Sequence, residues 1–241
     1  KAGNDMQRIM GYMRKAIQEY GMIEPGDRIA VGISGGKDSI ALAAGLAGLQ
    51  KFIGIPFQLV GVTLDPGWNG QRTDYGPIGQ MCESMGMAYH VLETEIGPIV
   101  FEAREESNPC SLCARMRRGA LHDAAQQFGC NKIALGHHYD DAVETFVMNL
   151  FHEGRVGCFS PVTYLSRKDL TMIRPLIFAP EREIASAVRK AGYPIIKSQC
   201  PVDGSTQREW TKNWLRQMEK EQKGITKRLF GAMKRGHISD W

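Results

Sequence analysis

The run Ser34–Ser39 (SGGKDS) has the residue types of a phosphate-binding loop, with an apolar stretch over 28–33 before it and a helical pattern directly after it. Glycines between a strand and a helix let the backbone approach an anion, and the first N–H groups of the helix face that anion. Lys37 adds a positive charge, and Asp38 is a candidate ligand of magnesium. The spacing is not that of the Walker A motif, and so short a run is also compatible with a surface turn.

Cysteines supply a second kind of chemistry. Cys110 and Cys113 form a Cys-x-x-Cys pair at the predicted start of a helix, where both thiols can bind one centre and the helix dipole lowers their pKa values. Taken alone, this pair is equally compatible with zinc, an iron–sulfur cluster or a redox couple. Cys82, Cys130 and Cys158 are instead expected to be buried or partly buried small apolar residues.

The segment 136–141 (GHHYDD) follows the apolar run 132–135 and places two histidines and two aspartates at the end of a predicted strand. Asp141 is a second candidate ligand of magnesium beside Asp38. Asp140 could instead cap the helix that begins there, because aspartate is a favoured N-cap residue.

These groups must be positioned by strands that alternate with helices. The predicted strands lie near 28–33, 57–63, 87–92 and 131–136, and the predicted helices near 38–51, 74–85, 111–129 and 140–152. This alternation predicts an α/β fold with a Rossmann-like parallel sheet and right-handed crossovers. Ligands of such sheets bind at the carboxyl ends of strands, where the phosphate loop, Asp65 and the segment 136–141 are all expected. We therefore expect one nucleotide site.

Helical extensions are expected at both ends of this unit. An amphipathic helix over roughly 4–21 carries an apolar stripe that could pack on the core or form a dimer. Further strands are predicted near 161–165 and 171–175, a helix over 181–191, and one or two polar helices after Gly204 that break near Gly224. The expected parts are an N-terminal helix (1–24), an ATP-binding domain with the cysteines (25–200) and a basic tail (201–241). The stretch 65–77 is either a loop over the site or a plain connector.

Composition bounds the class of protein. At 241 residues, with 43% hydrophobic and 23% charged residues, the chain fits one large soluble α/β domain with an appendage. No apolar stretch approaches the ~20 residues that span a bilayer, so no membrane partner is expected. Charges interrupt the first helix, unlike a signal peptide, and the missing initiator Met suggests that the chain begins inside a longer one.

Positive charge is concentrated in the tail. Residues 205–241 hold nine Lys or Arg and four Asp or Glu, a balance of +5, so the rest of the chain sums to −1 within the total of +4. A basic tail fits a polyanion such as RNA, although a solvated helix face has the same composition. Trp210, Trp214 and Trp241 could stack on bases or could dock the tail on the core.

The run Ser34–Ser39 resembles the PP-loop, the signature of the ATP-pyrophosphatase superfamily. Leu64-Asp65, the segment 136–141 and Arg174 stand where that superfamily has further nucleotide-site residues. The resemblance implies an adenine nucleotide α-hydrolase-like domain whose loop grips the β- and γ-phosphates of ATP, with AMP transferred to an oxygen. It also implies an adenine site near Leu64, a nucleotide-site role for His137 and a phosphate contact for Arg174.

A more specific resemblance extends from about residue 25 to 210. The segments 109–119 (PCSLCARMRRG), 132–141 (KIALGHHYDD) and 195–201 (IIKSQCP) closely resemble the tRNA 2-thiocytidine synthetase (TtcA-like) family. The resemblance implies a [4Fe–4S] cluster held by Cys110, Cys113 and Cys200, with one iron left without a protein ligand. Many members have a second Cys-x-x-Cys where this chain has Cys200 and Asp203, so Asp203 could approach that iron or complete a zinc site instead.

The activity that this resemblance implies is ATP-dependent thiolation of tRNA, in which O2 of an anticodon-loop cytidine is adenylated and then replaced by sulfur. It implies a sulfur donor, either a cysteine desulfurase or sulfide, a cytoplasmic location and, as one oligomeric state, a homodimer. The alternatives are a related PP-loop sulfurtransferase acting on uridine or a small molecule, and a non-catalytic nucleotide sensor with a metal or cluster.

The residues expected to act fall into four sets. The catalytic set is Lys37, Asp38, Asp141, Cys110 and Cys113. The ATP-binding set is Ser34, Gly35, Gly36, Lys37, Asp38, Ser39, Thr63, Leu64, Gly136, His137 and Arg174. Cys110, Cys113 and Cys200 are expected to hold the cluster, and Asp38 and Asp141 to hold magnesium. Arg115, Arg117, Arg118, Arg208 and Lys212 are expected to contact RNA.

Overall fold

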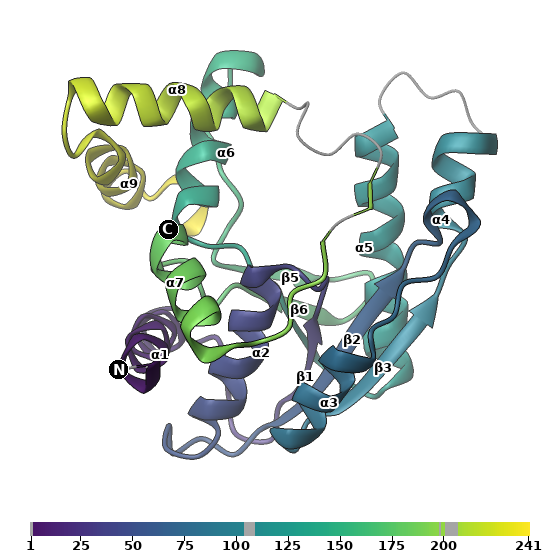
Figure 1. Cartoon of the computed structure of the whole chain (residues 1–241). Coiled ribbons are helices and arrows are strands. Elements are labelled where there is room, and N and C mark those ends of the chain that lie inside the picture. The colour runs from purple at the N-terminus through teal and green to yellow at the C-terminus, as the bar shows by residue number, and fades with distance from the viewer. Residues whose placement is uncertain (1, 104–108, 198, 201–206) are drawn as a thin grey trace.

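A single mixed sheet forms the centre of the molecule. The computed structural model describes residues 2–103, 109–197, 199–200 and 207–241. Within them, six strands pair in the order β3-β2-β1-β4-β6-β5 (Figure 1). Their bounds are β1 Arg28–Gly32, β2 Gln58–Asp65, β3 Ala88–Glu93, β4 Lys132–Ala134, β5 Val162–Leu165 and β6 Leu170–Ile173. The α/β Rossmann-like fold is thus confirmed, but β5 pairs antiparallel with β6, so the prediction of a wholly parallel sheet is corrected at that edge.

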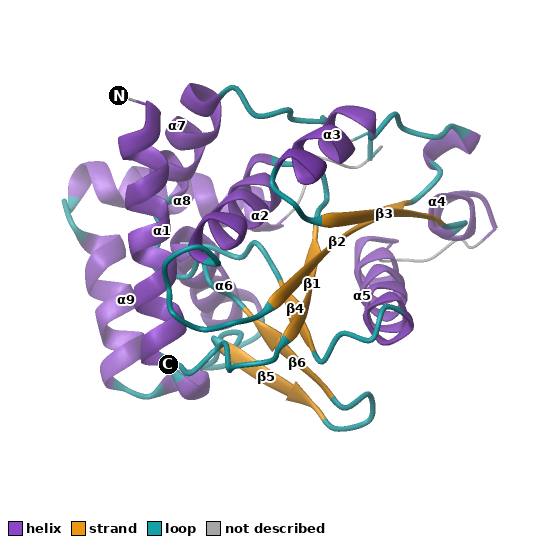
Figure 2. Ribbon diagram, turned by 90° about the horizontal axis from the view of Figure 1, so that it is seen from below, coloured by secondary structure: helices purple, strands orange, loops and turns teal. Residues whose placement is uncertain are grey.

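Helices cover both faces of the sheet. The longer helices are α1 Ala2–Glu19, α2 Lys37–Leu49, α3 Gly76–Ser84, α5 Pro109–Gln127, α6 Tyr139–His152, α7 Glu181–Ala191, α8 Gln207–Glu221 and α9 Ile225–Arg235. Figure 2 shows α5 on one side of the sheet and α1, α2 and α3 on the other. Short turns that the sequence did not predict occupy Ile96–Pro98 (α4) and Ile99–Ala103, and a further turn covers Trp68–Gly70 inside the predicted loop 65–77. Among the described helices, none is long and apolar enough to cross a membrane.

The strand order places the site. From β1 the chain moves outward to β2 and β3, and later returns to the other side of β1 to form β4 and β6. The point between β1 and β4 is therefore a topological switch point, where the two connections diverge and leave a crevice at the carboxyl ends of the strands. The loop 33–36 follows β1, and the segment 135–138 follows β4, so both reach this crevice.

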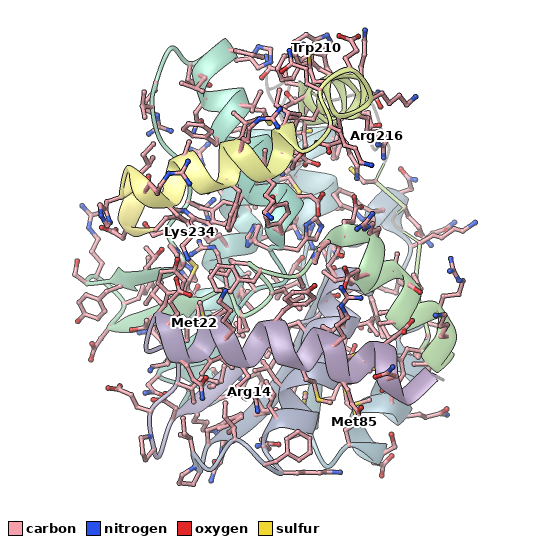
Figure 3. The ribbon with its side chains drawn as sticks, turned by 90° about the vertical axis from the view of Figure 1, so that its left-hand side faces the viewer. Arg14, Met22, Met85, Trp210, Arg216 and Lys234 are labelled. Carbon is pink, nitrogen blue, oxygen red and sulfur yellow. The ribbon has the colours of Figure 1, made fainter. Side chains whose placement is uncertain are left out.

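The apolar stripe of α1 is used inside the chain. Ile9, Met13 and Ile17 are almost completely buried against α2 and α7. Gly45 in α2 permits this packing, since a Cβ at that position would lie 2.3 Å from Sδ of Met13. Lys234 of α9, labelled in Figure 3, also pairs with Glu19 of α1. Of the two roles predicted for the stripe, packing on the core is therefore the one that the structure shows.

We expect Gly45→Leu to lower the free energy of unfolding by about 1–3 kcal/mol, because the added side chain overpacks the contact with α1. Gly11→Leu is the matched control, because a Cβ on Gly11 of α1 meets no atom within 4 Å. Urea unfolding followed by circular dichroism measures both. Equal stability of the two variants would contradict the account of the α1–α2 contact.

The C-terminal helices pack on α6. Leu215 of α8 is buried with Val143 and Val147, and Trp214 packs against the same cluster. The buried indole of Trp241 donates a hydrogen bond to the carbonyl oxygen of Phe159 at 2.7 Å. These two tryptophans therefore dock the tail, whereas Trp210 on α8 (Figure 3) remains half exposed. The predicted break at Gly224 is confirmed, because Gly224 has a φ of +83° between α8 and α9.

Candidate functional site

The loop between β1 and α2 has the geometry of an anion site. Gly35 has a φ of +87°, a conformation that favours glycine, and its carbonyl accepts a hydrogen bond from the N–H of Ile196 at 3.0 Å. Oγ of Ser39 accepts from the N–H of Ser34 at 3.1 Å and donates to the carbonyl of Gly36 at 2.9 Å. Gly36, at the N-cap, has no side chain to satisfy the first N–H groups of α2, so these groups are left for a phosphate.

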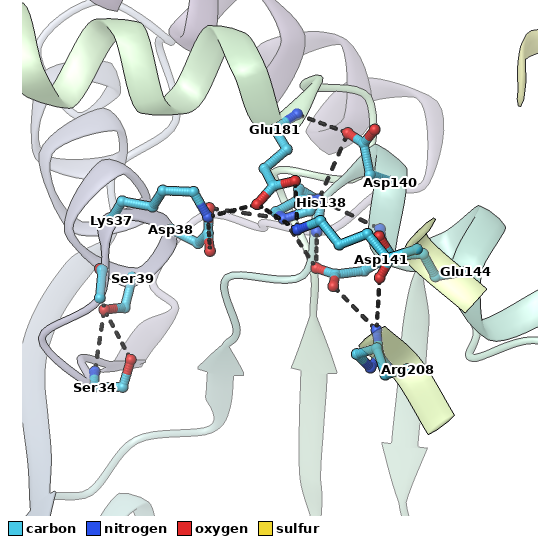
Figure 4. A network of polar contacts seen from close by, with 12 residues as sticks. Ser34, Lys37, Asp38, Ser39, His138, Asp140, Asp141, Glu144, Glu181 and Arg208 are labelled. Carbon is cyan, nitrogen blue, oxygen red and sulfur yellow. Dashed lines mark hydrogen bonds and ion pairs between the residues drawn. The ribbon is translucent and has the colours of Figure 1, made fainter. Parts of the chain in front are cut away.

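Lys37 lies between two carboxylates beside this loop (Figure 4). Its Nζ is 2.9 Å from Asp38 and 3.0 Å from Glu181, the first residue of α7. Burial would lower the pKa of Lys37, but the charges and hydrogen bonds of Asp38 and Glu181 together outweigh burial, so the pKa is raised. Burial would likewise raise the pKa of Glu181, but hydrogen bonds from Lys212 and Lys37 lower it to about 2. The lysine is thus charged and held by partners that a polyphosphate can replace.

Asp38 and Asp141 converge on His138. The imidazole Nδ1 of His138 accepts from the N–H of Asp141 at 3.3 Å, and Asp141 accepts from the N–H of His138, which forms a capping box at the start of α6. Nε2 of His138 then lies 3.7 Å from Oδ1 of Asp38 and 3.5 Å from Oδ2 of Asp141. Oδ1 of Asp38 is buried without a hydrogen-bond partner. Two converging carboxylates, one with an unpartnered oxygen, fit magnesium, which prefers oxygen ligands.

Asp140 takes the structural role that the sequence left open, although at another helix. Its carboxylate accepts from the N–H of Glu181 at 2.7 Å, so it satisfies the start of α7, while His138 caps α6. Cys82, Cys130 and Cys158 are buried or partly buried, as predicted. Asp203 and Gly204 lie outside the described residues.

Arg208 and Lys212 reach into the acidic network from α8. Arg208 contacts Asp141 at 3.2 Å and Glu144 at 3.4 Å, and Lys212 contacts Glu181 at 2.8 Å. Both residues were predicted to contact RNA, but the structure gives them carboxylate partners inside the site. Their charges offset an acidic cluster, so their part in RNA binding stays a prediction.

Glu144 is expected to make stability depend on pH. Burial raises the pKa of its carboxyl to about 7, Asp141 adds to this, and Arg208 opposes it only in part. A raised carboxyl pKa means that stability is lost as pH rises from the unfolded value near 4.5 through about 7. We expect Glu144→Gln to raise the free energy of unfolding more at pH 8 than at pH 4.5. The difference between the two effects should be about 2 kcal/mol in favour of pH 8. Thermal unfolding at both pH values measures this, with the exposed Glu153→Gln as control; a pH-independent effect would contradict it.

A cavity of about 410 Å³ opens beside the loop. It has an apolar wall from the strands and a polar side from the loop and α5. The lining residues that matter here include Val62, Leu64, Gly136, His137, Arg117 and Arg118, together with Ser34, Asp38 and Ser39 of the loop. A Cβ on Gly136 would lie 3.1–3.3 Å from the backbone of Asp38 and Ser39, so only glycine allows this approach. An apolar slot next to an anion site suits a nucleoside and its phosphates.

His137 lies half-buried in this wall. Burial lowers the pKa of its imidazole, and the nearby Arg174 lowers it further, so the ring is neutral at pH 7. Its Nδ1 has no hydrogen-bond partner. His122 of α5, which the sequence analysis missed, also lines the cavity and has a buried Nε2 without a partner. Both imidazoles can therefore bind a polar group of a ligand that enters the cavity.

Two residues predicted to bind ATP, Thr63 and Arg174, have backbone carbonyl oxygens as hydrogen-bond partners in the structure. Side chains alternate along a strand, so Val62 and Leu64 face the cavity and Thr63 faces away. Oγ1 of Thr63 donates to the carbonyl of Ile33 at 2.6 Å, so this side chain supports the loop from behind. Arg174 is buried and donates to the carbonyl of Ser160 at 2.5 Å; it lies behind His137, and a direct phosphate contact stays a prediction.

Cys113 and Cys200 line a second, adjoining cavity of about 230 Å³. The segment that follows α7 runs toward the start of α5 (Figure 1), and Cys200 on this segment lines the same cavity as Cys113 of α5. Cys110 lies on α5 three residues before Cys113, on the same helix face, and its side chain is exposed. Ser34, Leu64 and Arg117 line both cavities, so the thiols and the phosphate loop share walls. Cys113 and Cys200 therefore lie beside the phosphate loop, and a shared ligand role with Cys110 stays a prediction.

The electrostatics of the thiols correct one prediction. Burial raises the pKa of Cys113; Arg117 opposes this, and the neighbouring thiols of Cys200 and Cys110 raise it further. The net shift of the Cys113 pKa is therefore upward, whereas the sequence analysis predicted a lowered pKa. Neighbouring thiolates repel one another, so each thiol is harder to ionise. A bound metal cation offsets this repulsion and favours the thiolate form, so the arrangement is compatible with a metal centre. Over the described residues, no three His, Cys, Asp or Glu side chains already surround a single-ion site.

Comparisons with known proteins agree with this site. Residues 7–220 match the PP-loop domain family. The chain is 39% identical to a tRNA-cytidine(32) 2-sulfurtransferase of Geobacter sulfurreducens, over 94% of this chain and 89% of that protein. It is 40% identical to the protein of the same name from Geotalea daltonii, over 94% and 90%. The structure of U34-tRNA thiolase NcsA from Methanococcus maripaludis, with its [4Fe–4S] cluster, matches with a TM-score of 0.81 and 25% identity, over 97% of this chain and 79% of that one.

Proposed function

Since this chain belongs to the tRNA-cytidine(32) 2-sulfurtransferase family of PP-loop proteins, we propose that it uses ATP to replace O2 of a tRNA cytidine with sulfur. The observation that carries the proposal is the pair of adjoining cavities, one beside the phosphate loop and one lined by Cys113 and Cys200. Thiolation needs an activated carbon and a sulfur source held next to each other, and cavities that share Ser34, Leu64 and Arg117 as lining residues favour this. The relatives' names favour cytidine over the alternative substrates.

The chain's own residues support adenylation as the first step. We propose that the nucleoside of ATP occupies the larger cavity and that its phosphates lie over Ser34–Ser39. Attack of cytidine O2 on the α-phosphate releases pyrophosphate, and the N–H groups of α2 with Lys37 stabilise the departing charge. Magnesium, held by Asp38 and Asp141, would neutralise phosphate oxygens when bound. Lys37 must then exchange its contact with Glu181 for a phosphate, and Lys212 is in place to keep Glu181 paired.

Cys110, Cys113 and Cys200 would hold the [4Fe–4S] cluster that the fold relative contains. When bound, such a cluster with three protein ligands supplies an iron at which sulfide can be kept close to the activated base. Around it, the chain contributes a partly enclosed wall from Trp68, Tyr75 and Ile196, which limits the access of water to that base. We propose sulfide or a cysteine desulfurase as the source of sulfur, and the cytoplasm, where thiols stay reduced, as the location.

The proposed function is tested with anaerobically purified protein whose cluster has been reconstituted. Unmodified tRNA transcript, ATP, magnesium and sulfide are added, and the nucleosides are analysed by mass spectrometry after digestion. We expect 2-thiocytidine to form only when ATP is present, in step with AMP. Thiouridine without thiocytidine, or AMP formation without any thionucleoside, would overturn the proposed substrate.

A further inference from the structure

One face of α5 connects the two cavities. Cys110, Cys113, Arg117 and Leu121 follow each other at spacings of three, four and four residues, so they lie along a single stripe of the helix. The stripe begins at the thiols and ends at the apolar wall of the larger cavity, because Cys113 lines the smaller cavity and Leu121 the larger one. Arg117 stands between them.

Arg117 is distinguished by its position between the cavities. Among the described lining residues, Arg118 reaches only the larger cavity and Lys197 only the smaller one, whereas Arg117 lines both. Its charge acts on the Cys113 thiol, which places the two groups close together. No hydrogen bond or ion pair of the Arg117 guanidinium is recorded among the described residues, unlike Arg208 and Lys212, whose carboxylate partners were given above.

We propose that Arg117 is a catalytic residue of the sulfur-transfer step, in which its guanidinium binds the α-phosphate of the adenylated base. The proposal rests on the proposed function and deepens it. Hydrosulfide attacks C2 of the adenylated cytidine, the C2–S bond forms and the C2–O bond breaks. The oxygen leaves with AMP and the sulfur proton is released, so no oxidant or reductant is needed. Charge gathers on the departing phosphate, which lies where the two cavities meet.

Arginine suits this task for two reasons. Its planar fork binds two phosphate oxygens at once, and its delocalised positive charge attracts them. A cation that binds AMP as it forms also lowers the barrier to its departure, and the loss of one such donor typically costs about 10²–10³ in rate. The sequence analysis assigned Arg117 to RNA, a contact that stays a prediction, and in the structure its side chain lines both cavities.

The test separates the two half-reactions. Arg117→Ala and Arg117→Lys are compared with wild type for pyrophosphate release, for 2-thiocytidine formation and for AMP affinity, the last by calorimetry on protein without cluster. Arg14→Ala, an exposed arginine on α1 (Figure 3), is the matched control. We expect Arg117→Ala to reduce thiolation about 100-fold and AMP affinity about tenfold, to slow pyrophosphate release less, and to keep the cluster absorbance. Arg117→Lys should fall between Arg117→Ala and wild type.

The proposal is overturned if Arg117→Ala thiolates tRNA within twofold of wild type, or if thiolation falls while AMP affinity stays unchanged. Should Arg117→Ala fail to fold, Arg117→Lys decides the matter by the same two measurements. These results are distinct from a failure of the proposed function, in which the wild-type protein itself forms no 2-thiocytidine.

Discussion

Cys200→Ala is expected to remove both the iron–sulfur absorbance and tRNA thiolation. Cys200 lines the same cavity as Cys113, and it is the ligand that comes from outside α5. A cluster held by three thiolates loses a third of its protein ligands with this change, and the remaining Cys-x-x-Cys pair is too small a set to retain it. Activity below about 1% of wild type is expected, because the loss of an essential centre exceeds the loss of one hydrogen-bond donor.

The measurement is the visible absorbance and the iron content of anaerobically reconstituted protein, followed by thiolation. Cys130→Ala is the matched control, since Cys130 is buried near the end of α5 among Ala124, Ala125 and Ile133 and lines neither cavity described above. It should retain iron, absorbance and activity. Full iron content in Cys200→Ala would mean that the cluster is held by other residues.

Lys37→Ala is expected to reduce ATP-dependent pyrophosphate release by about 10²–10³. Lys37 is the positively charged residue of the phosphate loop, and its Nζ already lies between Asp38 and Glu181, where a cation balances two carboxylates. Without it, the phosphate would meet an acidic network that repels it. The cluster absorbance should remain, because Lys37 does not line the smaller cavity, which contains the thiols of Cys113 and Cys200.

Pyrophosphate release is followed with a coupled enzyme assay, and ATP affinity by calorimetry. Lys51→Ala, at an exposed position just beyond α2, serves as the control and should match wild type. If Lys37→Ala retained normal pyrophosphate release, phosphate binding would have to be assigned to the backbone of the loop alone.

The sequence correctly predicted features that depend on residues close together in the chain, such as strands, turns and helix ends. The strands near 28–33 and 57–63 appear as Arg28–Gly32 and Gln58–Asp65, because apolar runs between turn signals identify buried strands. The phosphate loop was visible because glycine, strand and helix start all lie within a few residues. The break at Gly224 was predicted for the same reason, since glycine alone readily takes a positive φ there.

The sequence analysis missed contacts between residues that are far apart in the sequence and close together in the fold. Nothing local indicates that Glu181 would reach Lys37, or that Arg208 would pair with Asp141, because each contact joins elements brought together only by the packed fold. Thr63 was assigned to ATP because it stands next to Leu64, yet strand alternation turns its side chain to the other face. The pKa of Cys113 is raised and not lowered as predicted, chiefly because its thiol is partly buried.

The convergence of the cysteines came from the resemblance and not from spacing. Cys110 and Cys113 alone left zinc, iron–sulfur and redox chemistry open. The structure adds the observation that Cys200 returns to the same cavity, guided by the hydrogen bond from Ile196 to the carbonyl of Gly35. One backbone contact thus ties the third thiol to the phosphate loop.

Anomalous diffraction at the iron edge, from anaerobically grown crystals that contain a non-hydrolysable ATP analogue, tests the central claim most directly. We predict an iron peak bounded by Cys110, Cys113 and Cys200, with the nucleotide in the adjoining cavity over Ser34–Ser39 and its α-phosphate beside Arg117. Iron bound away from these thiols, or a nucleotide on another face of the sheet, would contradict the claim that activation and sulfur transfer share one site.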